Sequence, residues 1–195
     1  MKAFWWFLIA LVAAGAWYYG FGGAAQLDKY AAESDEMKQS AFVTAFSDEN
    51  AGRFVTFTDP DYGFAVKYPI GFAADYNITD GPRLSARAVM DDNLFEIIEA
   101  NVQDVPLPHF GQTMASQGIT LSNMRNTTIS GKEAVLFDAS GTEPVSGEAY
   151  YGKWAFLDCA TPAGKRYTLG VTAAVSASLT SDLRMIDYVI YSVKC

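Results

Sequence analysis

The chain has 195 residues and a formal net charge of −8 at pH 7, and half of its residues are hydrophobic. Nucleic acid binding requires clustered lysine and arginine side chains, and this acidic sequence has no basic stripe, so we expect no nucleic acid partner. Aromatic residues make up 14% of the chain, which is enough apolar area for one core that needs neither a structural metal nor a disulfide. These values favour one domain with additional segments.

Residues 3–25 carry no charge. As a helix they would extend about 34 Å, which is enough to cross a hydrocarbon core of about 30 Å. Amphipathic aromatic side chains prefer the headgroup zone, and they gather at both ends of this segment. Those that we expect to anchor it are Trp5, Trp6, Trp17 and Tyr18. We therefore predict a single transmembrane helix over residues 3–25, in contact with the lipid bilayer.

The flanking charges indicate how this helix is oriented. Lys2 precedes it, whereas Asp28 and Glu33 follow it. The positive-inside rule then leaves the N-terminus in the cytoplasm and the C-terminal part in the periplasm, a lumen or the extracellular space. Small residues surround Gly15, so we expect any helix contact inside the bilayer to centre there. A cleaved secretory signal peptide is the alternative interpretation, which would leave the same domain in the same compartment without an anchor.

A helical stalk is expected next. Apolar residues recur near a 3.6-residue period from Gln26 to Phe46, and a polar run ends the pattern before residue 53. We therefore predict a stalk or linker over residues 26–52 and an extracytoplasmic domain over residues 53–195. One face of the stalk could pack on a neighbouring subunit or on its own domain, or the stalk could be a solvated spacer.

The C-terminal part has the pattern of an α+β domain. Short alternating segments separated by turn residues predict local hairpins and hence an antiparallel sheet. The predicted pairs are 54–58 with 64–68, 84–90 with 94–102, 119–129 with 133–137, and 149–159 with 166–173. The period then changes, and an apolar stripe predicts a C-terminal helix that lies on one face of the sheet, with Ser181 as its cap. The stripe consists of Leu183, Ile186, Val189, Ile190 and Val193.

The first hairpin also carries a recognisable motif. The run FTDPDYGFAVKYPIGF, residues 57–72, has seven matches to the pattern Y-x-D-P-x-Y-G-F-x-x-x-Y-P: Asp59, Pro60, Tyr62, Gly63, Phe64, Tyr68 and Pro69. It resembles the opening hairpin of the PsbP/Mog1-like family, although Ile70, Gly71 and Phe72 replace the commoner polar residues followed by tryptophan. The resemblance covers residues 53–195, including the final helix. It implies a PsbP/Mog1-like sandwich, and association with photosynthetic complexes or a role as a small protein-binding adaptor.

The two cysteines are Cys159, in a predicted strand, and Cys195, the last residue. In an oxidising compartment they would most simply form a disulfide that fixes the end of the chain to the sheet. One buried thiol and one exposed thiol is the other interpretation, because spacing alone does not decide between them.

The sequence contains no recognisable catalytic set. His109 is the only histidine, it lies between Pro108 and Phe110, and no G-x-S-x-G surrounds a serine. Asp59 and Asp61 flank a proline at a hairpin tip and are weak candidates for a metal site, but aspartate is also favoured at turns because it bonds local backbone. We expect no cofactor and no enzymatic activity.

Aromatic residues on one predicted strand allow two interpretations. Tyr150, Tyr151, Trp154 and Phe156 could form a binding surface, or they could belong to the core and its helix cover.

These observations lead to a functional hypothesis by exclusion and resemblance. We expect an accessory or assembly subunit of a larger photosynthetic or respiratory membrane complex, which acts by contact with integral membrane subunits. A membrane-tethered protein that binds a small ligand or metal outside the cytoplasm is the alternative, and a hydrolase that uses only carboxylates is a third hypothesis.

Overall fold

The structure is a computed structural model, and it describes residues 23–79, 81–90, 94–103, 120–143, 147–179 and 183–195. The chain divides into two compact units, residues 1–38 and residues 39–195, and the division falls within helix α2 (Gly23–Glu49). In the part of the chain that the structure describes, no helix has the length and hydropathy needed to cross a membrane. The segment predicted to cross lies mostly outside the described residues and stays a prediction, as do the roles of Trp5, Trp6, Gly15, Trp17 and Tyr18.

Helix α2 ends later than the sequence predicted, at Glu49 rather than Phe46. Its first described residues, 23–25, belong to the segment predicted to cross the membrane. Its end is closed by Asn50, whose backbone and side-chain amides both donate hydrogen bonds to the Phe46 carbonyl, at 3.1 and 3.0 Å. These bonds satisfy a carbonyl that a helix end otherwise leaves free. Residues 47–49 are therefore helical, although they are polar and do not continue the apolar pattern that predicted the helix.

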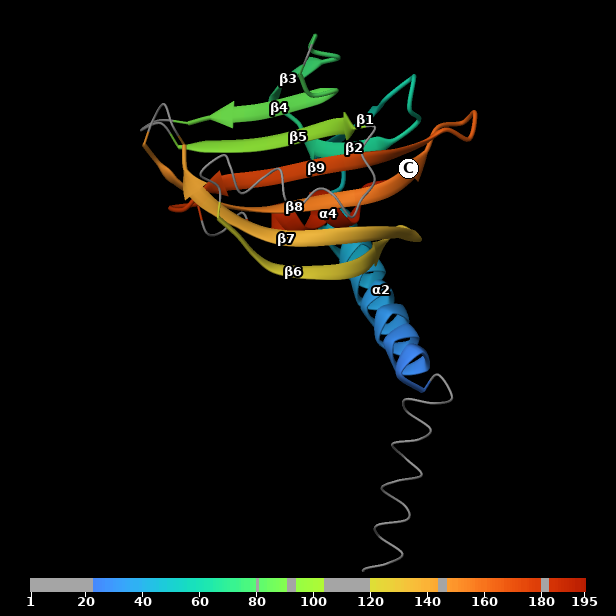
Figure 1. The fold of residues 1–195 in the computed structure, drawn as a ribbon. Coiled ribbons are helices and arrows are strands. Elements are labelled where there is room, and N and C mark those ends of the chain that lie inside the picture. The colour runs from blue at the N-terminus through green and yellow to red at the C-terminus, as the bar shows by residue number, and fades with distance from the viewer. Residues whose placement is uncertain (1–22, 80, 91–93, 104–119, 144–146, 180–182) are drawn as a thin grey trace, which may run out of the picture. The chain divides into compact units, whose positions relative to one another are not determined.

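An antiparallel sheet of seven described strands forms the centre of residues 39–195, in the order β3-β4-β5-β9-β8-β7-β6 (Figure 1). Strands β1 and β2 form a separate two-stranded sheet. The strands are β1 (Phe54–Thr58), β2 (Ala65–Pro69), β3 (Ala73–Tyr76), β4 (Leu84–Val89), β5 (Phe95–Gln103), β6 (Thr120–Ile129), β7 (Lys132–Thr142), β8 (Ala149–Ala160) and β9 (Arg166–Ser176).

All four predicted hairpins are present: β1–β2, β4–β5, β6–β7 and β8–β9. The β6–β7 turn consists of Ser130 and Gly131, both with positive φ (50° and 77°), as a two-residue turn between twisted strands requires. Strand β7 extends to Thr142 rather than ending at Phe137. Strand β3 was not predicted, because it has only four residues and their side chains are mostly exposed, which leaves no alternating pattern.

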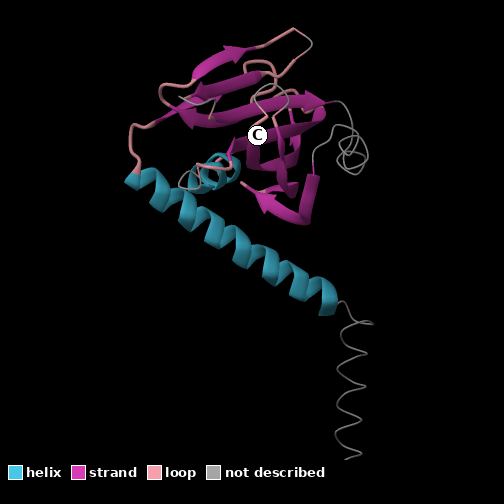
Figure 2. Cartoon of the chain, turned by 90° about the vertical axis from the view of Figure 1, so that its left-hand side faces the viewer, coloured by secondary structure: helices cyan, strands magenta, loops and turns pink. Residues whose placement is uncertain are grey.

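The core lies on one face of the large sheet. Helix α4 (Leu183–Tyr191) contacts β8, β9 and β2 there, and Figure 2 shows it against the curved strands. Its Ile186, Val189 and Ile190 are buried as predicted, and so is Val193 just beyond the helix, whereas Leu183 is 43% exposed. Ser181, the predicted cap, lies outside the described residues. The antiparallel sheet with its C-terminal helix is thus an α+β fold of the expected kind.

A second, smaller apolar cluster lies on the other side of strand β8. It contains Phe137, Ala139, Trp154 and Phe156, whereas the alternate β8 residues Ala155 and Leu157 belong to the main core, because successive strand residues face opposite sides. Trp154 and Phe156 are buried, and Tyr151 is half exposed. Trp154 and Phe156 therefore pack inside this cluster and do not form an open aromatic surface.

The packing of α4 on the sheet gives a stability prediction. Replacement of Ile190, which is fully buried, by Ala should lower the free energy of unfolding by about 3 kcal/mol, because it removes buried methyl groups and leaves a cavity. Urea denaturation measures this change. Leu183→Ala in the same helix is the matched control and should change stability little, and equal losses for the two variants would contradict the packing described here.

Candidate binding cleft

The first hairpin is held by the buried carboxylate of Asp59. This side chain is fully buried, and it accepts hydrogen bonds from the backbone N–H groups of Asp61 and Tyr62, both at 2.9 Å. The turn then closes at Gly63, whose φ is +77° and whose hydrogen leaves room for Pro162. The D-P-x-Y-G part of the sequence motif therefore encodes a tight turn with an internal acceptor.

Arg83, just before β4, ties this turn to the large sheet. Its guanidinium donates to Asp59 at 2.7 Å and to Asp61 at 2.5 Å, and it lies 5.2 Å from the centre of the Tyr62 ring. Burial opposes the charged form of Asp59, but the hydrogen bonds from Arg83, Tyr62 and Asp61 and the charge of Arg83 outweigh it, so the pKa of Asp59 lies below its usual value of 3.8. The two weak metal candidates are thus the partners of one arginine.

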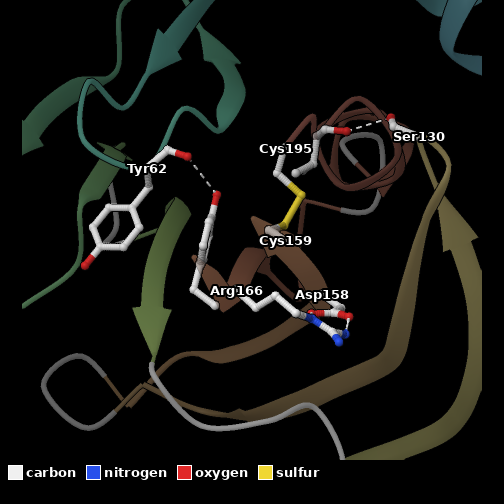
Figure 3. Close-up of a disulfide and its surroundings, with 8 residues drawn as sticks. Tyr62, Ser130, Asp158, Cys159, Arg166 and Cys195 are labelled. Carbon is white, nitrogen blue, oxygen red and sulfur yellow. Dashed lines mark hydrogen bonds and ion pairs between the residues drawn. A yellow bond between two sulfur atoms is a disulfide. The ribbon is translucent and has the colours of Figure 1, made fainter. Parts of the chain in front are cut away.

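The C-terminal tail joins three parts of the domain. Cys195 lies at disulfide distance from Cys159 on β8, with Cα atoms 5.6 Å apart (Figure 3), and the predicted disulfide is formed. The hydroxyl of Ser130, in the β6–β7 turn, donates to the Val193 carbonyl at 2.6 Å. Lys194 and Ala65 exchange two backbone hydrogen bonds, which attach the tail to β2.

A cleft of about 590 Å³ opens where the end of α2, the first hairpin and the start of α4 meet. A volume of this size lies within the range of sites that hold small ligands or side chains. Its described lining comes from four separate stretches of the chain and consists of Phe46, Glu49, Asn50, Gly52, Arg53, Phe54, Pro69, Ile70, Glu96, Arg184 and Met185.

The walls of the cleft are fixed by local bonds and aromatic contacts. The Ile70 N–H donates to the Arg53 carbonyl at 2.8 Å, which connects the two sides of the first hairpin at the cleft. The Phe46 ring lies 4.7 Å from that of Tyr188, and Tyr188 is in turn 4.7 Å from Phe54. Because Tyr188 is almost fully buried, these rings give the cleft a preformed apolar floor.

Among the described residues, four that line the cleft are charged, two of each sign. The Arg184 guanidinium lies 5.3 Å from the centre of the Phe46 ring and donates to Glu49 at 3.1 Å. Arg53 is exposed and donates to the side-chain oxygen of Asn50 at 3.3 Å. Glu96 is buried. The cleft can therefore bind a ligand through apolar contact and ion pairing.

Other groups with chemical potential lie elsewhere or are not described. His109 lies outside the described residues. Within the described ranges, no three histidine, cysteine, aspartate or glutamate side chains gather as a metal site would require. The described lining of the cleft contains neither a histidine nor a serine or cysteine.

The sequence did not reveal this cleft. Glu49, Asn50 and Arg53 were interpreted as the polar end of a stalk and the edge of a domain, because no periodic pattern connects them to α4. Ile70 carried the one usable signal. It stands where the resembled motif commonly has a polar residue, and its side chain is 65% exposed.

Comparison with known proteins supports the fold. No protein-family model matches the sequence, and no curated protein does. LpqN of Mycobacterium tuberculosis, described as involved in cell envelope biogenesis, has 15% identity and a TM-score of 0.52, over 76% of this chain and 94% of LpqN. Cyanobacterial PsbP (CyanoP) of Synechocystis sp. PCC 6803 has 16% identity and a TM-score of 0.51, over 73% of this chain and 92% of CyanoP. The domain has a PsbP-like α+β fold, as the first hairpin suggested.

The buried Asp59 gives a pH-dependent prediction. Asp59→Asn should lower the free energy of unfolding at pH 7 by about 3 kcal/mol, because it leaves Arg83 and the turn without their charged acceptor. Since folding lowers the pKa of Asp59, its contribution is complete well above pH 3.8 and is lost as the pH falls through the folded-state value. Denaturation curves of both proteins should therefore converge in acid.

Asp61→Asn is the matched control for Asp59, because Asp61 meets the same arginine with a side chain that is 69% exposed. It should cost less than about 1 kcal/mol. If Asp61→Asn lowered the free energy of unfolding as much as Asp59→Asn, burial would not determine how much each ion pair stabilises the fold.

The disulfide gives a third prediction. Cys195→Ser should lower the free energy of unfolding by about 4 kcal/mol, because the bond closes a loop of 36 residues and restricts the unfolded chain. Guanidinium denaturation with and without a reductant measures this. The reductant should destabilise the original protein by a similar amount and leave the variant unchanged, and a further loss in the variant would contradict the assignment.

Proposed function

We propose that this chain is a non-enzymatic accessory or assembly subunit of a larger membrane protein complex. Residues 3–25 anchor it in the bilayer with the N-terminus in the cytoplasm, and the acidic domain acts on the periplasmic or lumenal side by contact with integral membrane subunits. A photosynthetic or respiratory complex is the specific form of this proposal.

The observation that carries the proposal is the PsbP-like fold. Similar structures include a cyanobacterial PsbP and a protein described as involved in cell envelope biogenesis. One fold can serve many functions, so these similarities suggest a kind of role and do not identify a specific one. The cleft is a surface on which the domain can contact another molecule.

The disulfide supports the compartment. Cys159 and Cys195 are both bonded, and structural disulfides persist mainly in oxidising compartments. The predicted orientation of residues 3–25 leads to the same side of the membrane. Two independent features, one in the sequence and one in the fold, therefore favour an extracytoplasmic domain.

A tethered small-ligand protein is the second candidate, and the cleft favours it through its volume of about 590 Å³. A Ca²⁺ site at Asp59 and Asp61 has less support, because a cation would have to displace the Arg83 guanidinium from both carboxylates. A monomer whose melting temperature rises with a small ligand would favour this candidate over the first.

The proposal predicts a stable association in the membrane. After extraction of the full chain with a mild detergent, native electrophoresis and mass spectrometry should show it migrating with the same set of membrane subunits in repeated preparations. Migration as a monomer in every mild detergent would contradict the accessory role.

Variants of the membrane segment control for the role of the anchor. Gly15→Leu should weaken retention of the chain in the complex, because a large side chain keeps two helices from approaching closely. Val12→Leu adds one methylene to an already large residue in the same segment, and it should leave retention unchanged.

A further inference from the structure

We infer that the cleft is a docking site for an extended segment of a partner protein that presents an apolar side chain next to a carboxylate. This inference rests on the proposed function, since it assigns the surface through which an accessory subunit contacts its partner. It specifies both the place on the domain and the chemistry of the occupant.

The apolar floor of the cleft would bind the apolar side chain of the partner segment. Phe46 and Met185 are buried, with exposures of 7% and 8%, and Phe54 packs against the same core. Ile70 lines the same cleft, yet its side chain is 65% exposed. An apolar side chain placed against these residues would cover Ile70 and remove more apolar area from water, and anchors of this kind dominate protein interfaces.

Arg53 is the residue that would bind the carboxylate of the partner segment. Among the described residues its guanidinium contacts the amide oxygen of Asn50 at 3.3 Å and no carboxylate. The chain as a whole has a net charge of −8, whereas the described lining of the cleft has two arginines and two glutamates. A carboxylate from another chain can form a bidentate pair with Arg53 without breaking an ion pair within the described domain.

Arg184 offers a second, exchangeable contact. Its pair with Glu49 is exposed on both sides, at 60% and 55% of the side-chain surface, and exposed pairs of this kind contribute little. The guanidinium lies over the Phe46 ring, so it forms the boundary between the charged rim and the apolar floor. An occupant with adjacent apolar and acidic groups matches this boundary.

The remaining charges favour a peptide over an anionic surface. Glu49 lines the same cleft, and its carboxylate would repel a polyanion or a sheet of lipid phosphates. One side-chain carboxylate can reach Arg53 while the backbone N–H groups of its own chain lie near Glu49. The Ile70–Arg53 backbone hydrogen bond of 2.8 Å keeps the site preformed, which limits the entropic cost of binding.

The test uses defined peptides and the full chain in detergent micelles. The probe is the fluorescently labelled, amide-capped peptide glycyl-phenylalanyl-aspartyl-glycine, compared with one in which lysine replaces the aspartate and one in which alanine replaces the phenylalanine. Fluorescence anisotropy should show at least about fivefold weaker binding for each altered peptide. Equal binding of all three peptides would overturn the inference.

Charge reversal makes the test specific to Arg53. Arg53→Glu should weaken binding of the aspartate peptide at least about fivefold and strengthen binding of the lysine peptide, because the sign of the contact is exchanged. Arg125→Glu, at an exposed arginine on β6 outside the cleft, is the matched control and should change neither. Likewise Ile70→Ala should weaken binding, while Val89→Ala, at a side chain of nearly equal exposure (67%), should not.

A lipid occupant is a separate outcome of the same assay. Soluble dihexanoyl phosphatidylglycerol should not compete with the aspartate peptide. Competition that is stronger than that of the unlabelled peptide and is lost in Arg53→Glu would overturn the inference in favour of a lipid headgroup.

Photo-crosslinking in cells separates the inference from the proposed function. A benzophenone side chain at position 70 should form an adduct with a co-migrating subunit, and the same group at position 89 should not. Co-migration with adducts only at position 89 would overturn the docking site and leave the accessory role standing. Absence of co-migration for the unsubstituted chain would overturn the proposed function.

Discussion

The buried carboxylate of Asp59 is the interaction on which the arrangement of the domain depends. It holds its own turn through two backbone N–H groups, and it reaches the large sheet through Arg83. A two-stranded hairpin is marginal by itself, so β1 and β2 need such connections to keep one position. The wall of the cleft formed by Phe54, Pro69 and Ile70 belongs to this hairpin, and its geometry therefore depends on a charge placed about as deep as the core.

The C-terminal tail provides a second connection with different physics. Asp59 acts by an electrostatic contact within the first third of the domain. The Cys159–Cys195 bond instead joins the end of the chain to β8. The backbone of Lys194 pairs with that of Ala65 in β2. The hairpin is thus held from both sides by groups far apart in sequence. The disulfide therefore holds the tail at β8, next to the residue that bonds to β2.

Local features of this fold could be predicted from the sequence, and long-range features could not. Alternation and turn residues identified the four hairpins, and the stripe from Ile186 to Val193 identified α4, because each signal lies within one segment. Strand β3 and the pairing of β5 with β9 carry no such local signal. Asp59 shows the same limit. The turn and the bonding of Asp59 to local backbone were predicted from the motif, with a metal ion as the weaker alternative. Its partner Arg83 is 24 residues away, so the ion pair was not predicted. The described lining of the cleft combines four stretches of the chain, and Ile70 is its one residue that departs from the motif.

The proposed docking chemistry is compatible with weak intrinsic affinity. One apolar side chain and one exposed ion pair contribute only a few kcal/mol, which corresponds to dissociation constants near the millimolar range. An anchor that shares a membrane with its partner raises the effective concentration of the domain to a similar range when the linker spans the distance. Helix α2 covers 27 residues, and it lies in the chain between the segment proposed as the anchor and the domain. Under the proposed function, the membrane anchor keeps the domain concentrated near its partner, and the cleft selects which segment binds. Binding at the cleft would therefore require both the anchor and the domain.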